Sequence, residues 1–331
     1  MKINLSKLLF TSTLITGTII TVTSKSWIIM WIGLEMNLLS FIPMMNSNKN
    51  PYENEAAMKY FITQAMASMI LLLSILLSTE GNPNSNINLT LLLTSLLTKM
   101  GAAPFHLWFP AVMQGLTWIN CFILMTWQKI APMMMIGYQM CTSTLSNIII
   151  LMSVLVGAVG GLNQTSTRKM MAYSSISHIG WMLMAINMSY KLWTLYFIIY
   201  SLINLSIIII MYQASLYHLS QIFTLGGKSM NKFIMFLSML SLAGMPPFLG
   251  FLPKWIIIQN TTSYEGIMMI TIMAMTTMIT LYFYLRIIYS AITFSGQKPT
   301  WMNSNLKLSL MMVSLTISLL GIPAITLVSI Y

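Results

Sequence analysis

Long apolar runs determine what this chain can fold into. Most of the sequence is divided into apolar segments of about 17–25 residues, the length that an α-helix needs to cross a bilayer. Inside the hydrocarbon core, backbone polar groups must be satisfied by the protein itself, so that only helices and closed barrels span it. The runs are too continuous for the alternating strands of a barrel. We therefore predict an all-α polytopic membrane protein.

Composition excludes two other classes. Only 6% of the 331 residues are charged and 57% are apolar, whereas about 25% charged residues is usual in a soluble domain. The net charge of +11 comes from single, scattered basic residues, without the basic face of a nucleic-acid-binding protein. We expect lipids, and no nucleic acid, around the chain.

Eleven transmembrane helices are predicted, with the fourth interrupted at 101–110 and the ninth at 244–253. The predicted helices span residues 3–23, 26–45, 57–79, 87–120, 122–141, 145–163, 170–189, 192–216, 232–262, 266–293 and 307–330.

The basic residues predict the orientation of these helices. With the amino terminus on the positive side, the other side receives only Lys25 and Lys191 among the loop residues. The positive side collects Lys2, Lys7, Lys49, Arg168, Lys169, Lys228, Lys232, Lys298 and Lys307. This asymmetry agrees with the positive-inside rule and supports the number of spans.

The two interruptions share one motif. The segment GAAPFHLWFP at 101–110 and the segment GMPPFLGFLP at 244–253 both follow the pattern G-x-x-P-F-x4-P. Glycine and proline break helices, and matching broken helices in two halves of a chain are typical of repeat-built transporters. Because five spans separate the copies, they enter the membrane in opposite senses. We predict one membrane domain: a first repeat at 1–142, an inverted second repeat at 145–294 and a last helix at 306–331.

Four charged residues lie deep within the predicted spans or directly beside a break. Each costs roughly 2.5–3.5 kcal/mol at a helix centre, so such residues are candidates for function. Glu35 is too deep to reach the surface, and Lys99, before the first break, is its expected partner. Lys129 and Lys254 are buried amines that can act as proton relays, because burial disfavours the charged form. The alternatives are a helix-association pair for Glu35 and snorkelling for the lysines.

Two histidines are further candidates. His106 lies in the first break and His178 in the seventh predicted helix. A histidine can gain and lose a proton near neutral pH, although a hydrogen-bonding or packing role is an equal alternative for each. No G-x-G-x-x-G or Walker sequence and no Cys/His cluster occurs, so neither a cofactor nor a metal site is expected in this chain.

Several segments resemble a known family. They are GLEMNLLSFIP (33–43), KMGAAPFHLWFP (99–110), TWQKIAP (126–132), GAVGGLNQTSTRKMMAYSSISHIGWM (157–182) and LAGMPPFLGFLPKW (242–255). These segments resemble the antiporter-like subunits of mitochondrial NADH:ubiquinone oxidoreductase, respiratory complex I, and in particular its subunit 2 family. They are also similar to the large subunits of multisubunit sodium/proton antiporters.

This resemblance implies a proton-translocating subunit that uses energy from quinone reduction elsewhere in the complex. It implies that Glu35 and Lys99 form a coupled pair, that Lys129 is the central relay and that Lys254 is the exit-side lysine. NADH, FMN, Fe-S clusters and ubiquinone are then expected on other subunits. The animal form lacks three initial helices, so neighbouring membrane-arm and accessory subunits are expected to cover helices 1–5.

The resemblance also implies the mitochondrial inner membrane, with the amino terminus on the matrix side. The absence of aspartate and the 34 methionines agree with an AT-rich mitochondrial gene. Two alternatives remain open from the sequence: a stand-alone cation/proton antiporter and a non-pumping structural membrane subunit.

Overall fold

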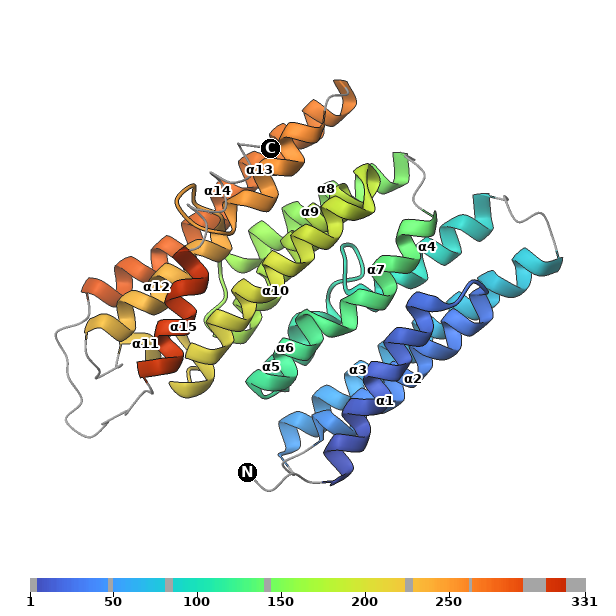
Figure 1. Cartoon of the computed structure of the whole chain (residues 1–331), viewed down its shortest axis with the longest axis horizontal. Helices are drawn as coiled ribbons and strands as arrows, with labels where there is room; N and C mark the ends of the chain where they lie inside the picture. Colours follow the sequence, from blue (N-terminus) through green and yellow to red (C-terminus); the bar gives the residue numbers. More distant parts are fainter. Residues whose placement is uncertain are drawn as a thin grey trace. The chain divides into compact units, whose positions relative to one another are not determined.

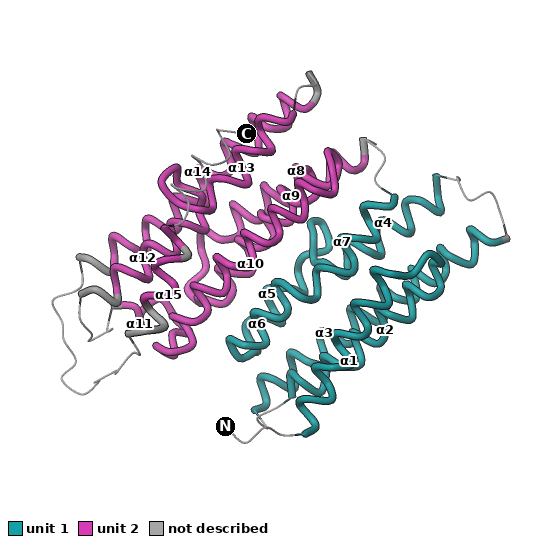
Figure 2. The backbone as a smooth tube through the Cα atoms, in the orientation of Figure 1, with its two compact units in different colours: residues 1–143 teal, residues 144–331 magenta. Residues whose placement is uncertain are grey.

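The computed structural model describes residues 5–46, 50–80, 86–139, 144–223, 229–261, 264–293 and 308–319. These residues are helical except for turns, breaks and one isolated antiparallel bridge between Ser166 and His218 (Figure 1). The chain divides into two compact units, residues 1–143 and 144–331 (Figure 2).

Unit 1 contains seven helical segments in its described part. They are α1 Leu5–Thr23, α2 Trp27–Met45, α3 Pro51–Glu80, α4 Asn86–Met100, α5 Trp108–Gly115, α6 Trp118–Met125 and α7 Trp127–Gln139. Helix α1 packs against α2 and α7, α2 packs against α3, and α3 packs against both α4 and α5. Helix α4 packs against α7, which closes a five-helix arrangement in which α4–α5 and α6–α7 are interrupted helices.

Unit 2 repeats this order of packing. Its described helices are α8 Thr144–Gly161, α9 Thr167–Met188, α10 Tyr190–Gln213, α11 Leu219–Phe223, α12 Ser229–Ala243, α13 Phe251–Asn260, α14 Tyr264–Thr293 and α15 Leu308–Leu319. Helix α8 packs against α9 and α14, α9 against α10, α10 against α12 and α13, and α12 against α14. Each unit therefore contains the same five-helix pattern, and α15 is added against α10 and α12.

The predicted spans coincide with these helices, apart from the added short helix α11, an interruption of the fifth span between α6 and α7, and three shifted ends. The third span begins at Pro51 instead of 57, because proline is favoured at the first helical position. The second half of the fourth ends at Gly115, after which Leu116 is extended with ψ 155°. The fifth therefore begins at Trp118 instead of 122.

Length and apolar composition mark six helical segments of the described chain as long enough to cross a membrane. They are Leu5–Thr23, Trp27–Met45, Pro51–Thr79, Trp118–Gln139, Tyr190–Gln213 and Gly266–Ser290. Residues 320–331 of the predicted last helix lie outside the described residues. So do five of the basic residues used for the orientation: Lys2, Lys49, Lys228, Lys298 and Lys307. The orientation stays a prediction.

Glycines allow one helix pair in each unit to approach closely. A Cβ added to Gly33 of α2 would lie 2.8 Å from the carbonyl oxygen of Gly17 of α1. A Cβ added to Gly157 of α8 would lie 2.5 Å from the backbone nitrogen of Ser177 of α9. Small residues at such contacts let the backbones of membrane helices approach closely, and the close approach increases the van der Waals packing between them. The α1–α2 and α8–α9 pairs are thus fixed by backbone contact.

We expect Gly157→Ala to destabilise the protein by about 1–3 kcal/mol, because the new methyl group meets backbone atoms that move only with α9. Thermal unfolding in mild detergent measures this change. Val159→Ala is the control on the same helix, since Val159 is 58% exposed. Equal melting temperatures for the two variants would contradict the close α8–α9 contact.

Candidate functional site

The first break follows the end of α4. Gly101 has φ +73°, a conformation that glycine adopts without strain. Its N–H donates to the carbonyl of Thr98 at 3.2 Å, and the N–H of Ala102 donates to the carbonyl of Leu97 at 3.1 Å. These two bonds form a Schellman motif, which satisfies carbonyl groups at a helix end. The indole Nε1–H of Trp108 adds a bond of 3.0 Å to the carbonyl of Thr98.

The second break has the same construction at the end of α12. Gly244 has φ +85°. Its N–H bonds to the carbonyl of Ser241 at 3.2 Å, and that of Met245 bonds to the carbonyl of Leu240 at 3.4 Å. Here the side-chain donor is Lys254, whose Nζ donates to the carbonyl of Ala243 at 2.9 Å. Both predicted interruptions are confirmed, and Lys254 is placed on one of them.

The structure brings Glu35 and Lys99 together. The distance from Lys99 Nζ to Glu35 Oε1 is 4.0 Å, and the exposed fractions of the two side chains are 4% and 24%. Glu35 Oε1 is buried and has no hydrogen-bond partner among the described residues. The pair is therefore an ion pair without a direct hydrogen bond, and small side-chain movements change its distance.

A polar cavity of about 20 Å³ lies beside Lys99. It is lined by Leu34, Asn37, Leu38, Tyr60, Gln64, Lys99, Gln128 and Pro132. Tyr60 donates from its hydroxyl to Gln128 Oε1 at 3.4 Å, and Gln64 donates from Nε2 to the carbonyl of Lys99 at 3.3 Å. Such a volume accommodates one water molecule, and buried polar groups supply its partners. Asn37 Oδ1 and Gln128 Nε2 are buried without a hydrogen bond within the described chain, and they suit that role.

Sequence reasoning missed Tyr60, Gln64 and Gln128. The i, i+4 spacing of Tyr60 and Gln64 is a signal, because it places two polar side chains on one face of an apolar helix. Gln128 lies next to Lys129 in the chain, so its backbone connects the cavity to the next buried amine.

Lys129 is buried, with 1% of its surface exposed. It lies between two positions at which the regular helix of its span is disturbed. Thr126, with φ −114° and ψ −72°, separates α6 from α7, and its hydroxyl donates to the carbonyl of Phe122 at 2.7 Å. Pro132 lies inside α7 and lacks the N–H that would bond to the preceding turn. The Nζ of Lys129 lies 5.2 Å from the ring centroid of Phe109, within cation–π range.

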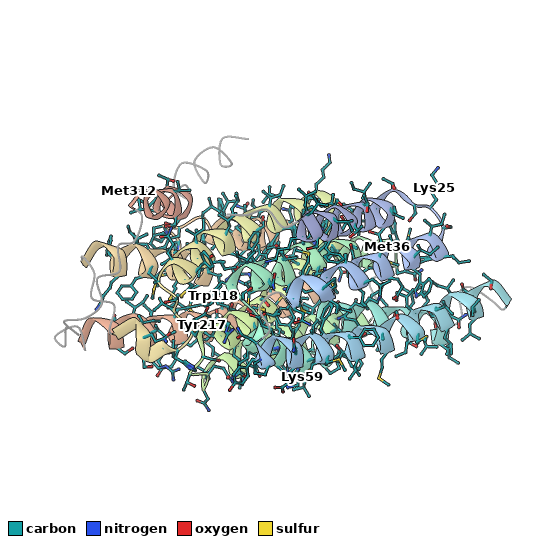
Figure 3. All side chains as sticks on the ribbon, turned by 90° about the horizontal axis from the view of Figure 1, so that it is seen from below. Lys25, Met36, Lys59, Trp118, Tyr217 and Met312 are labelled. Carbon is teal, nitrogen blue, oxygen red and sulfur yellow. The ribbon has the colours of Figure 1, made fainter. Side chains whose placement is uncertain are left out.

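Phe109 connects this amine to the first break. A Cβ added to Gly101 would lie 3.0 Å from Phe109 Cβ, so the ring packs directly on the helix end. By contrast, Lys59 lies at the outside of unit 1 and pairs with Glu55 one turn away (Figure 3). Burial beside irregular backbone therefore distinguishes Lys129 from a surface lysine.

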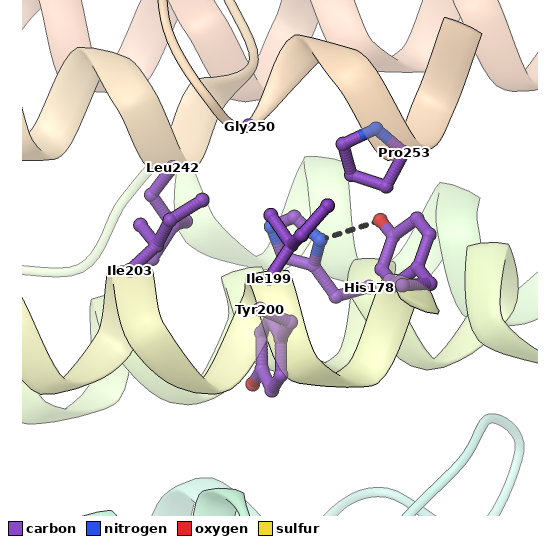
Figure 4. Close-up of a pocket in the computed structure, with 8 residues that line it drawn as sticks. His178, Ile199, Tyr200, Ile203, Leu242, Gly250 and Pro253 are labelled. Carbon is purple, nitrogen blue, oxygen red and sulfur yellow. Dashed lines mark hydrogen bonds between the residues drawn. The ribbon is translucent and has the colours of Figure 1, made fainter. Parts of the chain in front are cut away.

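The two histidines have different surroundings. His106 lies in the first break at intermediate exposure, with Nδ1 3.2 Å from the carbonyl oxygen of Pro104. His178 of α9 is buried, with Nδ1 2.8 Å from the hydroxyl of Tyr196, and it lines a cavity of about 10 Å³ (Figure 4). The described residues contain no group of three His, Cys, Asp or Glu side chains that could hold a metal ion.

Comparison with known proteins identifies relatives over almost the whole chain. Residues 24–280 match the family described as NADH:quinone oxidoreductase/Mrp antiporter, TM. The chain is 47% identical to NADH-ubiquinone oxidoreductase chain 2 of Anopheles gambiae, covering 98% of this chain and 97% of the relative. It is 40% identical to the protein of the same name in Elephas maximus, covering 97% of each.

Solved structures share the fold. Respiratory complex I from Thermus thermophilus contains a chain with TM-score 0.82 and 22% identity, covering 95% of this chain and 76% of that chain. The Mrp complex of a Dietzia species contains one with TM-score 0.80 and 17% identity, covering 95% and 74%. The predicted fold class, an all-α polytopic membrane protein of inverted five-helix repeats with two discontinuous helices at the shared motif, is confirmed. The further interruption between α6 and α7 was not predicted.

We expect each of the single variants Glu35→Gln and Lys99→Met to be less stable than the variant that carries both changes. Each single change leaves one buried charge without its opposite, whereas the double change removes both. The partial exposure of Glu35 limits the coupling to about 1 kcal/mol. A double-mutant cycle of thermal unfolding measures this energy. Additive effects would show that the two charges do not interact.

Proposed function

The chain belongs to the NADH:quinone oxidoreductase/Mrp antiporter transmembrane family, and we propose that it translocates protons as the subunit 2 type membrane subunit of an NADH:ubiquinone oxidoreductase through Glu35, Lys99, Lys129 and Lys254. The observation that carries the residue assignment is the burial of three lysines: Lys99 and Lys254 flank the two breaks, and Lys129 contacts the ring of Phe109 from the first one. No rule of helix packing needs amines at these positions, whereas proton transfer does.

In this proposal, the Glu35–Lys99 pair is the input. At 4.0 Å and an effective dielectric constant near 20, two unit charges interact by about 4 kcal/mol. Solvent access to Glu35 reduces this value to the coupling of about 1 kcal/mol given above, which is a sizeable fraction of the roughly 2.3 kcal/mol needed to move one charge across 100 mV. A movement of Glu35 towards or away from Lys99 therefore changes the field in unit 1 by an amount relevant to pumping.

The polar cavity supports transfer from Lys99 to Lys129. A proton released by Lys99 enters the cavity that Tyr60, Gln64 and Gln128 line. Water held there, together with the Tyr60 hydroxyl, offers exchangeable protons next to the chain segment that carries Lys129. Lys254 is the later acceptor in this proposal, and His106 and His178 are further exchange groups.

Cofactors and partners follow from the same proposal. The chain itself carries no NADH, FMN, Fe-S or ubiquinone site, and these groups lie on other subunits. Its partners are neighbouring antiporter-like and accessory subunits of the membrane arm, which cover helices 1–5, together with lipids. We place it in the mitochondrial inner membrane with its amino terminus in the matrix.

The membership of the complex is tested by native electrophoresis of mildly solubilised membranes. An in-gel NADH oxidation stain locates the complex, and mass spectrometry locates this chain. Co-migration in a very large assembly is expected. A small species without NADH oxidation would instead indicate a stand-alone antiporter.

The relay is tested at Lys129. We expect both Lys129→Met and Lys129→Arg to lower the number of protons pumped per electron, because methionine holds no proton and arginine does not release one. Lys191→Met is the control, since Lys191 is exposed at the start of α10. Proton uptake and NADH oxidation are recorded together in vesicles that contain the assembled complex. Unchanged stoichiometry in both Lys129 variants would refute the relay.

A further inference from the structure

The two interrupted helices match beyond the G-x-x-P-F-x4-P motif. Gly101 and Gly244 are separated by 143 positions (244 minus 101). Ser95 donates its hydroxyl to the carbonyl of Leu92, and Ser238, 143 positions after Ser95, donates to the carbonyl of Met235. The same spacing relates Thr98 to Ser241, whose hydroxyls also bond to the carbonyl three residues back. The repeats therefore correspond residue by residue along α4 and α12.

This correspondence relates the cavity of unit 1 to the cavity of unit 2. Lys99 lines the first cavity, and Leu242, 143 positions later, lines the second. The residue 143 positions after Glu35 is His178, which also lines the second cavity. The second cavity thus has a leucine at the position of Lys99 and a histidine at the position of Glu35, whose carboxylate pairs with Lys99 in unit 1.

Helices α3 and α10 carry a similar pair, although the offset between the two units is 140 positions there (200 minus 60). Tyr60 and Gln64 of α3 line the first cavity, while α10 contains Tyr200 and Asn204 at the same spacing of four. The ring of Tyr200 lies 5.0 Å from that of His178, centroid to centroid. Since leucine holds no proton, His178 is the lining residue of the second cavity that can gain and lose a proton near neutral pH.

We propose that Tyr196 is a positioning residue for proton transfer through His178. This proposal rests on the proposed pumping function. The Tyr196 hydroxyl and His178 Nδ1 are 2.8 Å apart, and the two residues are 1% and 7% exposed. Figure 4 shows this bond at the wall of the cavity, below Pro253 of α13. The hydrogen bond comes from the neighbouring helix α10, so it fixes the direction of the imidazole ring within the bundle.

The bond determines which ring nitrogen exchanges the proton. In the proposed arrangement, Nδ1–H donates to the Tyr196 hydroxyl oxygen both before and after protonation. The proton is taken from cavity water onto Nε2 and later leaves from Nε2, so that the ring returns to its starting tautomer. A hydrogen bond at one ring nitrogen assigns the other nitrogen to proton exchange in this way. Tyrosine suits the role because its hydroxyl accepts this bond while donating its own hydrogen elsewhere.

Other titratable groups near His178 come from three helices. They are Tyr196 and Tyr200 on α10, which line the same cavity, Lys254 on α13, which follows the cavity residue Pro253, and Tyr284 on α14, which lies near Tyr200. Helix α8, which packs along α9, contains no titratable side chain in its sequence. The pH profile of Tyr196→Phe is therefore compared with that of the unchanged protein, in which these other groups are all present.

The test combines Tyr196→Phe and His178→Gln in the assembled complex. We expect Tyr196→Phe to slow pumping roughly two- to tenfold, the effect of one hydrogen bond, and to change its pH profile. His178→Gln should also lower pumping, and adding Tyr196→Phe to it should have no further effect. Tyr282→Phe is the control, because Tyr282 is 59% exposed.

Two outcomes would overturn the inference. One is normal pumping by His178→Gln, which decides the matter even if Tyr196→Phe does not assemble. The other is a Tyr196→Phe effect of equal size with and without His178, which would show a purely structural role. If Lys129→Met lowers the stoichiometry while the Tyr196 and His178 variants pump normally, the proposed function stands and this inference alone fails.

Discussion

The structure depends on how backbone groups are satisfied where two membrane helices stop inside the apolar part of the chain. An unpaired carbonyl in hydrocarbon costs several kcal/mol, so each stop needs donors at fixed positions. Gly101 and Gly244 provide them through a left-handed turn that brings two N–H groups back to the helix end. Trp108 and Lys254 add side-chain donors. Because the carbonyl groups at the breaks are hydrogen-bonded, the breaks are polar sites inside the protein. Buried amines and small polar cavities can exist beside them.

Each unit combines this polar break with a rigid pair of helices. Glycines hold α1 to α2 and α8 to α9 at backbone contact, whereas the groups proposed to carry protons face the interrupted helices. Glu35 lies on α2 and His178 on α9, so in both units a titratable side chain projects from the rigid pair towards the broken helix. The backbone that carries such a side chain therefore stays in place while the side chain and its partners move.

The sequence predicts the spans, the breaks and the Glu35–Lys99 pair because these features are local or rest on scarce charges in apolar runs. The end of α5 at Gly115 was not predicted, since it depends on contact with the backbone of Tyr52, from a distant helix. The cavity beside Lys99 was also missed, because the Tyr60–Gln128 bond joins residues 68 positions apart. His178 was predicted as a candidate, but its partner Tyr196 depends on the rotation of α10, which an apolar sequence does not determine.

The bond from Lys254 to the carbonyl of Ala243 links chemistry to mechanics. The same hydrogen atoms that the amine could exchange also hold the last turn of α12. By thermodynamic reciprocity, the free energy by which loosening of this helix end changes proton binding to Lys254 equals the free energy by which protonation of Lys254 changes the loosening of the helix end. In the proposed relay, the second break therefore couples the conformation at the end of α12 to proton binding by Lys254.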